Sequence, residues 1–278
     1  MPLGNGRHHR SGLGTAGPPA YRTGMLFRQF LNDETACASY LLGCNSAGEL
    51  AVVDAHADLV DEYIAAAERQ GSRIAAVLET HLQADHVSGL PEIVERTGAA
   101  AYLPEGSGAE FAHRPLADGE LVKLGNTVIQ ALATPGHAPA HHAYLVTDHR
   151  RGDEPWMVLT GDALLVGDAG RPDLHAAGEQ AVEEMARTLY RSLTERLLAL
   201  PDHMLLYPAH YSGSVCGRGL SGNPVSTIGF ERRHNRALGF DSEDAFVAAM
   251  VEDLPPAPED QAAIVAANRR GSPRTAIA

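Results

Sequence analysis

The sequence predicts an α/β fold that is rich in strands, and three observations support this. Short apolar runs bounded by turn residues recur along the chain, few stretches have helical spacing, and the two kinds of segment do not alternate strictly. Regular βαβ alternation would predict one parallel sheet, so we expect two mixed sheets with helices outside them. At 278 residues the chain can bury a sizeable core as one large domain or two small ones.

The expected elements follow in order along the chain. Three β-rich runs at 26–30, 38–44 and 49–55 are typical of consecutive strands at a sheet edge. Residues 57–70 carry apolar side chains at helical spacing, and the nearly continuous apolar run 74–80 predicts an interior strand that leads into another helix. Further strands are expected at 99–103, 120–123, 126–133, 142–147, 156–160 and 203–208, and helices at 179–200 and within 226–270.

The two ends of the chain differ from its middle. Residues 1–24 are rich in Gly, Pro, Arg and His and lack the apolar segment of a secretory signal, so they predict a flexible tail. Translation starting at Met25 instead of Met1 is an open alternative. Residues 25–278 predict a single domain whose C-terminal extension, about 226–278, is helical.

Composition excludes several classes of partner. The formal net charge of −13 leaves no basic field to attract nucleic acid or a membrane surface. No stretch reaches the roughly 18 apolar residues of a membrane span. The three scattered cysteines, Cys37, Cys44 and Cys216, are too few for a disulfide framework and indicate a reducing, cytoplasmic location.

Four segments with ligand-type side chains each follow an expected strand. They are ETHLQADHVSG (79–89), TPGHAPAHH (134–142), TGDALLVGDAGRPDL (160–174) and YPAHYSGSVCG (207–217). Because ligands gather at the carboxyl ends of strands in α/β sheets, we expect the four segments to meet at one site.

The order of these segments resembles the metallo-β-lactamase superfamily, whose signature is T-H-x-H-x-D-H, then a lone His, an Asp and a last His. The resemblance covers about residues 25–235 and implies an αββα sandwich with the metal at one edge. The matching positions are His81, Gln83, Asp85, His86, His137, Asp162 and His210.

Within the superfamily the sequence is most similar to the persulfide dioxygenases, or sulfur dioxygenases, including those fused to rhodanese domains. The similarity lies in ETHLQADHVSG, GDALLVGDAGRPDL and the stretch TIGFERRHN. The resemblance implies one Fe(II) held by His81, His137 and Asp162, which would bind a low-molecular-weight persulfide and O2 and release sulfite. Two imidazoles and one carboxylate also accept zinc or manganese, so the choice of iron rests on the family resemblance.

Gln83 stands where the superfamily signature has its second histidine. A neutral amide is a far poorer zinc ligand than imidazole, which favours a mononuclear site over a dinuclear one. Two alternatives stay open: a dinuclear zinc thioester hydrolase of glyoxalase-II type, and a non-catalytic member that carries or senses sulfur through Cys216. The second metal of the hydrolase would use Asp85, His86 and His210 around Asp162.

The remaining candidates surround this expected site. In a mononuclear centre Gln83, Asp85, His86 and His210 would orient the ligands and bound water. Arg171 is expected either to recognise a carboxylate of a thiol carrier such as glutathione or to form an ion pair with Asp168 or Asp173. Tyr211 and Cys216 are candidates for the pocket lining, whereas Cys37, Cys44 and the histidines without motif support, among them His175, are expected to be structural. Expected partners are the persulfide, O2, a separate rhodanese and a second copy of the chain.

Overall fold

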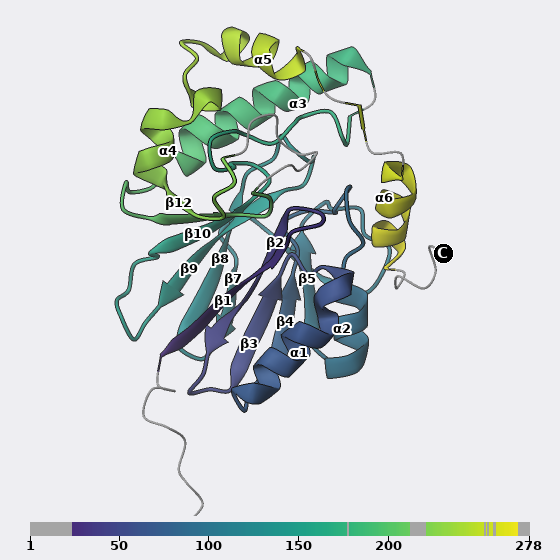
Figure 1. Cartoon of the computed structure of the whole chain (residues 1–278), viewed down its shortest axis with the longest axis vertical. Coiled ribbons are helices and arrows are strands. Elements are labelled where there is room, and N and C mark those ends of the chain that lie inside the picture. The colour runs from purple at the N-terminus through teal and green to yellow at the C-terminus, as the bar shows by residue number, and fades with distance from the viewer. Residues whose placement is uncertain are drawn as a thin grey trace, which may run out of the picture.

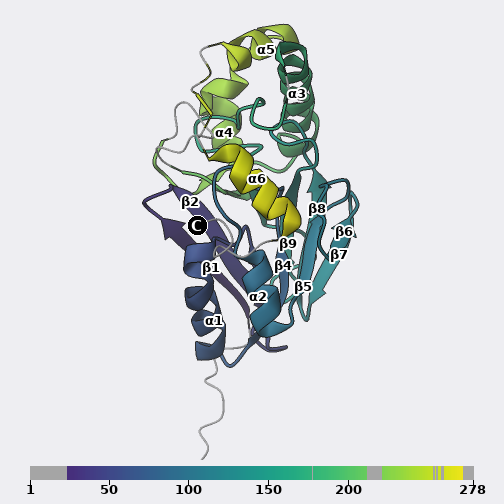
Figure 2. The same cartoon turned by 90° about the vertical axis from the view of Figure 1, so that its right-hand side faces the viewer.

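The computed structural model describes residues 24–176, 178–211, 221–252, 254, 256–257 and 260–271. Within these residues two six-stranded mixed sheets pack face to face and carry helices on their outer surfaces (Figures 1 and 2). The predicted αββα sandwich is therefore confirmed. No helix in the described part of the chain combines the length and the apolar character needed to cross a membrane.

The first sheet has the strand order β1-β2-β3-β4-β5-β6. Its strands β1 to β3 are antiparallel, whereas β3 to β6 run parallel. The strands are β1 (Met25–Asn32), β2 (Cys37–Cys44), β3 (Glu49–Val53), β4 (Arg73–Leu78), β5 (Ala100–Pro104) and β6 (Arg114–Leu116). The short strand β6 was not expected, since a three-residue run that contains proline gives little strand signal.

The second sheet has the strand order β12-β11-β10-β9-β8-β7, and within it β10 and β11 form the parallel pair. The strands are β7 (Leu121–Leu124), β8 (Thr127–Ala133), β9 (His142–Asp148), β10 (Met157–Gly161), β11 (Leu205–Pro208) and β12 (Ser226–Thr227). The expected strands 120–123, 126–133, 142–147, 156–160 and 203–208 are confirmed within a few residues, whereas the two-residue strand β12 was not expected.

Helices cover both outer faces of the sandwich. Beside the first sheet lie α1 (Val60–Arg69), preceded by the turn η2 (Ala57–Leu59), and α2 (Leu90–Thr97). The second sheet is covered by α3 (Glu179–Arg191), α4 (Ile228–His234) and α5 (Glu243–Val251), with the short helices η3 (Ser192–Leu197) and η4 (Arg236–Leu238). In Figures 1 and 2, α6 (Gln261–Arg270) lies between the α1/α2 pair and the α3–α5 group.

Successive side chains along each strand point to opposite faces of the sheet, and this alternation builds the layered core. In β2, Tyr40 and Leu42 face the second sheet, while Leu41 between them packs against the α1 side. The space between the sheets is filled by apolar side chains of both, for example Val53 of β3 and Ile129 of β8. Since both faces of these strands are buried, the nearly continuous apolar runs in the sequence are explained.

The ends of several strands bring the ligand-bearing segments to one edge of the sandwich. Strand β4 ends at Leu78, two residues earlier than expected, which releases Glu79 and Thr80 into the loop that carries His81. The parallel neighbours β10 and β11 end beside each other and deliver Asp162 and His210. Of the predicted tail, 1–24, residues 1–23 lie outside the described part of the chain, and so do residues 272–278.

Candidate metal centre

Two buried imidazoles and one buried carboxylate converge at this edge. The Asp162 Oδ2 atom lies 3.9 Å from His81 Nε2 and 3.5 Å from His137 Nε2. Asp162 Oδ2 and His137 Nε2 are buried and have no hydrogen-bond partner among the described residues. The three residues that the sequence assigns to the iron therefore come together around one point.

The neighbours of the two imidazoles determine which ring nitrogen is protonated. His137 Nδ1 lies 2.9 Å from the Arg171 carbonyl oxygen, which can accept a proton but not donate one. The Thr80 hydroxyl donates to both oxygens of Asp54, so its own oxygen accepts from His81 Nδ1 at 3.0 Å. Both Nε2 atoms thus present lone pairs toward Asp162 Oδ2. These three atoms are all acceptors, so only a cation placed between them can satisfy them together.

The protonation states also suit a metal ion. Burial and the nearby His137 lower the pKa of His81 well below its usual value, so its imidazole is neutral. Burial alone would raise the pKa of Asp162, but the adjacent His210 and the imidazoles of His137 and His81 hold it below its usual range. Neutral imidazole and ionised carboxylate are the forms that bind metals.

His210 connects the carboxylates of Asp162 and Asp85. Its Nδ1 atom lies 2.6 Å from Asp162 Oδ1, and its Nε2 atom lies 2.5 Å from Asp85 Oδ2. Both ring nitrogens are therefore engaged, and Asp162 is held by one oxygen while the other faces the imidazoles. This arrangement suits a residue that positions a ligand rather than one that binds a second metal.

A second cluster adjoins the first through His210. Cys37 Sγ lies 3.3 Å from His210 Nε2 and 3.8 Å from His86 Nδ1, and the ligand atoms of Cys37, Asp85, His86 and His210 all lie within 4.8 Å of one another. Burial opposes ionisation of the Cys37 thiol, but the two histidines lower its pKa to about 6. Cys37 is buried as expected, yet it faces ionisable groups instead of apolar core.

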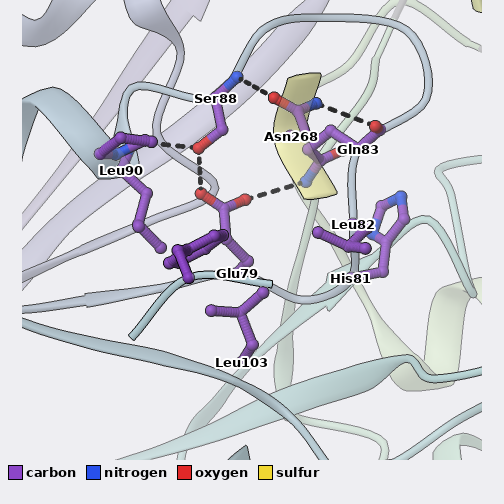
Figure 3. A pocket seen from close by; sticks show the side chains of 10 residues that line it. Glu79, His81, Leu82, Gln83, Ser88, Leu90, Leu103 and Asn268 are labelled. Carbon is purple, nitrogen blue, oxygen red and sulfur yellow. Dashed lines mark hydrogen bonds between the residues drawn. The ribbon is translucent and has the colours of Figure 1, made fainter. Parts of the chain in front are cut away.

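Gln83 turns away from the two metal-facing imidazoles. Its side-chain amide donates to Asp54 Oδ1 at 3.1 Å and, as Figure 3 shows, to Glu79 Oε2 at 3.4 Å. Burial raises the pKa of Asp54 to about 7 and that of Glu79 to about 8. The surrounding pocket of about 10 Å³ holds no more than about one water molecule, so these groups interact with each other and not with a substrate.

Two further histidines lie at the centre. His141 is buried, and its Nε2 atom accepts from the Asp162 backbone N–H, which fixes the start of that loop. His175 was expected to be structural, but the structure places it with His81 and His137 in one group of possible metal ligands. No motif marks His175 in the sequence, and its closeness to GRPDL is the one signal that could have identified it.

The predicted pocket residues have different surroundings. Arg171 is buried and forms a bidentate ion pair with Asp173, with both N–O distances at 2.7 Å. The expected ion pair between Arg171 and Asp173 is thus confirmed, whereas recognition of a substrate carboxylate by Arg171 stays a prediction. Tyr211, beside His210, donates to Asp33 Oδ1 at 2.6 Å. Cys216 falls in 212–220, outside the described residues.

Asn268 of α6 holds the loop that carries His86, a role that no motif in the sequence indicates. Its Nδ2 atom donates to the carbonyl oxygens of Gln83 and His86, and its Oδ1 atom accepts from the Ser88 backbone N–H. Figure 3 shows the bonds to Gln83 and Ser88. All three distances are between 2.9 and 3.0 Å. Helix α6 therefore fixes the loop that carries His81 and His86 by hydrogen bonds to its backbone.

We expect Asn268→Asp to loosen this loop. A carboxylate oxygen would face two carbonyl oxygens, at a cost of about 2–3 kcal/mol of unfolding free energy, because two buried acceptors lose their donor. Chemical unfolding measures the loss, and Asn223→Asp at an exposed position is the matched control. Equal stability of the two variants would contradict the role of Asn268.

Comparison with known proteins agrees with this geometry. Residues 32–210 match the family model described as "Metallo-beta-lactamase superfamily". The chain is 30% identical over 276 residues to human persulfide dioxygenase ETHE1, mitochondrial, which covers 98% of this chain and 96% of the human protein. It is also 30% identical over 191 residues to a hydroxyacylglutathione hydrolase of Polaromonas sp., covering 68% of this chain and 64% of that protein.

A solved structure shares the fold over most of the chain. The crystal structure of ETHE1 from Myxococcus xanthus superposes with a TM-score of 0.76 at 32% sequence identity, covering 88% of this chain and 98% of that one. The family match, the two packed mixed sheets and the convergent His and Asp side chains all agree. The chain belongs to the metallo-β-lactamase superfamily.

Proposed function

We propose that the protein is a mononuclear Fe(II) persulfide dioxygenase, which oxidises the sulfane sulfur of a low-molecular-weight thiol persulfide to sulfite with O2. The observation that carries the proposal is the convergence of His81, His137 and Asp162, with Gln83 turned away and both His210 nitrogens engaged. Relatives that are persulfide dioxygenases at about 30% identity support it.

Iron fits these three residues, since two neutral imidazoles and one carboxylate are a donor set that non-haem oxygenases use. His81, His137 and Asp162 would hold the Fe(II), which would supply the redox chemistry that joins O2 to the persulfide sulfur. The reaction consumes persulfide, O2 and water, oxidises the sulfane sulfur, reduces O2, and releases the thiol, sulfite and protons.

The chain contributes orientation and protonation state. Thr80, backed by Asp54, and the Arg171 carbonyl hold the two imidazoles with Nε2 toward the centre. His210 holds one oxygen of Asp162, so the other stays directed at the same point. The buried surroundings exclude bulk water, which limits competing hydrolysis.

A cavity beside the centre suits a small thiol carrier. It has a volume of about 650 Å³ and is lined by His175 and by residues of α6 that include Arg269 and Arg270. Guanidinium groups match carboxylates, so the two arginines are candidates for binding an anionic carrier such as glutathione. We further propose a cytoplasmic location, a separate rhodanese as supplier of sulfane sulfur, and a homodimer.

Metal analysis paired with O2 uptake tests the proposal. Protein purified anaerobically is expected to hold about one iron per chain and to consume O2 when glutathione persulfide is added. His81→Ala is expected to abolish both. About two zinc ions per chain with no O2 uptake would overturn the dioxygenase.

A thioester hydrolase is the second candidate, and two observations favour it. Hydroxyacylglutathione hydrolases are among the relatives, and Cys37, Asp85, His86 and His210 form a second group of possible ligands beside Asp162. Hydrolysis of S-lactoylglutathione by protein loaded with zinc, without O2 uptake, would support this candidate over the first.

A further inference from the structure

His175 brings a third imidazole to the metal centre. The ligand atoms of His81, His137 and His175 all lie within 4.8 Å of one another. The His175 ring stands edge-on to the other two, at centroid distances of 6.2 Å from His81 and 6.1 Å from His137. Its Nε2 atom is buried and has no hydrogen-bond partner among the described residues.

No described polar group explains this placement. A buried imidazole nitrogen that lacks a partner loses its hydrogen bond to water and gains nothing in return. His137 Nε2 and Asp162 Oδ2 are unpartnered in the same way and face the same region. Three unpartnered buried atoms, one from the loop after β8 and two from the loop after β10, point to one shared ligand, which is a cation.

Gln83 leaves room for such a third imidazole. Its amide is committed to Asp54 and Glu79, and in Figure 3 it is directed at Glu79 and not at the His81 ring. The residue two positions after His81 therefore supplies no ligand atom. A third nitrogen ligand would therefore have to come from elsewhere in the chain, and His175 lies in the same loop as Asp162, between β10 and α3.

We propose that His175 Nε2 binds the same metal ion as His81, His137 and Asp162, and so takes the place of the histidine that Gln83 replaces. This inference rests on the metal centre of the proposed function but not on its reaction. Burial and the nearby His137 lower the pKa of His175 to about 4, so the ring is neutral at pH 7.

The position of His175 also defines the route to the metal. The same side chain lines the cavity of about 650 Å³ beside α6. A metal ion held by four protein ligands would have fewer positions left for the persulfide sulfur and O2 than one held by three. A substrate entering from this cavity therefore meets the metal next to His175.

Titration of the metal-free protein with Co(II) tests the proposal without any turnover. We expect His175→Asn to weaken Co(II) binding by at least about 10-fold in competition with a chelator, and to change the visible d–d bands because one nitrogen ligand is lost. His149→Asn is the matched control, since this side chain is 43% exposed and pairs with Asp153. Unchanged Co(II) affinity and bands in His175→Asn would overturn the proposal, and so would weaker binding with unchanged bands.

A double-mutant cycle tests the exchange with position 83. In the Gln83→His background, His175→Asn is expected to weaken Co(II) binding several-fold less than in the wild type, because the new imidazole can supply the third nitrogen. Equal losses in both backgrounds would contradict the replacement.

The two proposals fail in different ways. If the protein binds Co(II) through His175 but consumes no O2 with glutathione persulfide, the proposed dioxygenase activity is contradicted and the role of His175 as a ligand is supported. If the protein consumes O2 but its His175→Asn variant binds Co(II) as the wild type does, the dioxygenase activity is supported and the role of His175 as a ligand is contradicted.

Discussion

Asp162→Asn is expected to abolish tight metal binding and O2 uptake while leaving the metal-free protein at least as stable as the wild type. The amide oxygen can still accept from His210, which lies 2.6 Å from Asp162 Oδ1. The amide nitrogen would then donate to the Nε2 lone pairs of His81 and His137 and satisfy them without a metal. The affinity loss should exceed the roughly 10- to 100-fold that removal of an outer hydrogen-bond partner costs.

Two measurements check this prediction. Chelator competition reports the metal affinity, and thermal unfolding of both metal-free proteins reports stability. His149→Asn again serves as the control for an aspartate-paired side chain outside the centre. An Asp162→Asn protein that keeps one tightly bound metal would contradict the assignment of Asp162 as a ligand.

Gly170→Ala is expected to disrupt the centre from a position that bears no ligand. A Cβ atom at Gly170 would lie 1.9 Å from the Asp162 carbonyl oxygen and 3.0 Å from His137 Nδ1. The first contact is with backbone, so the loop must move and carry both ligands with it. We expect a loss of about 3 kcal/mol or more in unfolding free energy, a fall of very roughly 10 °C in Tm, and at least about 10-fold weaker metal binding.

Gly152→Ala is the matched control, since a Cβ atom there meets nothing within 4 Å. Gly152→Ala should leave Tm and metal affinity near the wild-type values. If Gly170→Ala behaved like Gly152→Ala, the close approach of the 170 backbone to Asp162 and His137 would have no consequence for the metal centre.

Much of the fold was predictable because burial leaves a clear signature in sequence. The apolar runs of β2, β4 and β10 are buried on both faces, and the amphipathic spacing of α1 matches a helix packed on one side of a sheet. Strands β6 and β12 were missed because two or three residues carry too little pattern.

The sequence was enough to predict that His81, His137 and Asp162 converge. Each lies in a loop after a strand, and such loops meet at the edge of a sheet. Local sequence could not reveal the contacts that prepare them. Asp54 acts on His81 through Thr80 from the end of another strand, and Asn268 reaches the His86 loop from α6, about 180 residues away in sequence.

The sequence by itself determined the class of the fold, the superfamily and the three side chains that converge at one edge of the sandwich, because periodicity and ordered motifs are local properties of the chain. The tertiary structure alone decided that Gln83 faces Asp54 and Glu79, that Cys37 lies against His210 and His86, and that His175 joins His81 and His137. The physical reason is that hydrogen bonding and metal binding depend on distances of a few ångströms between atoms, and the packing of loops from different strands sets those distances.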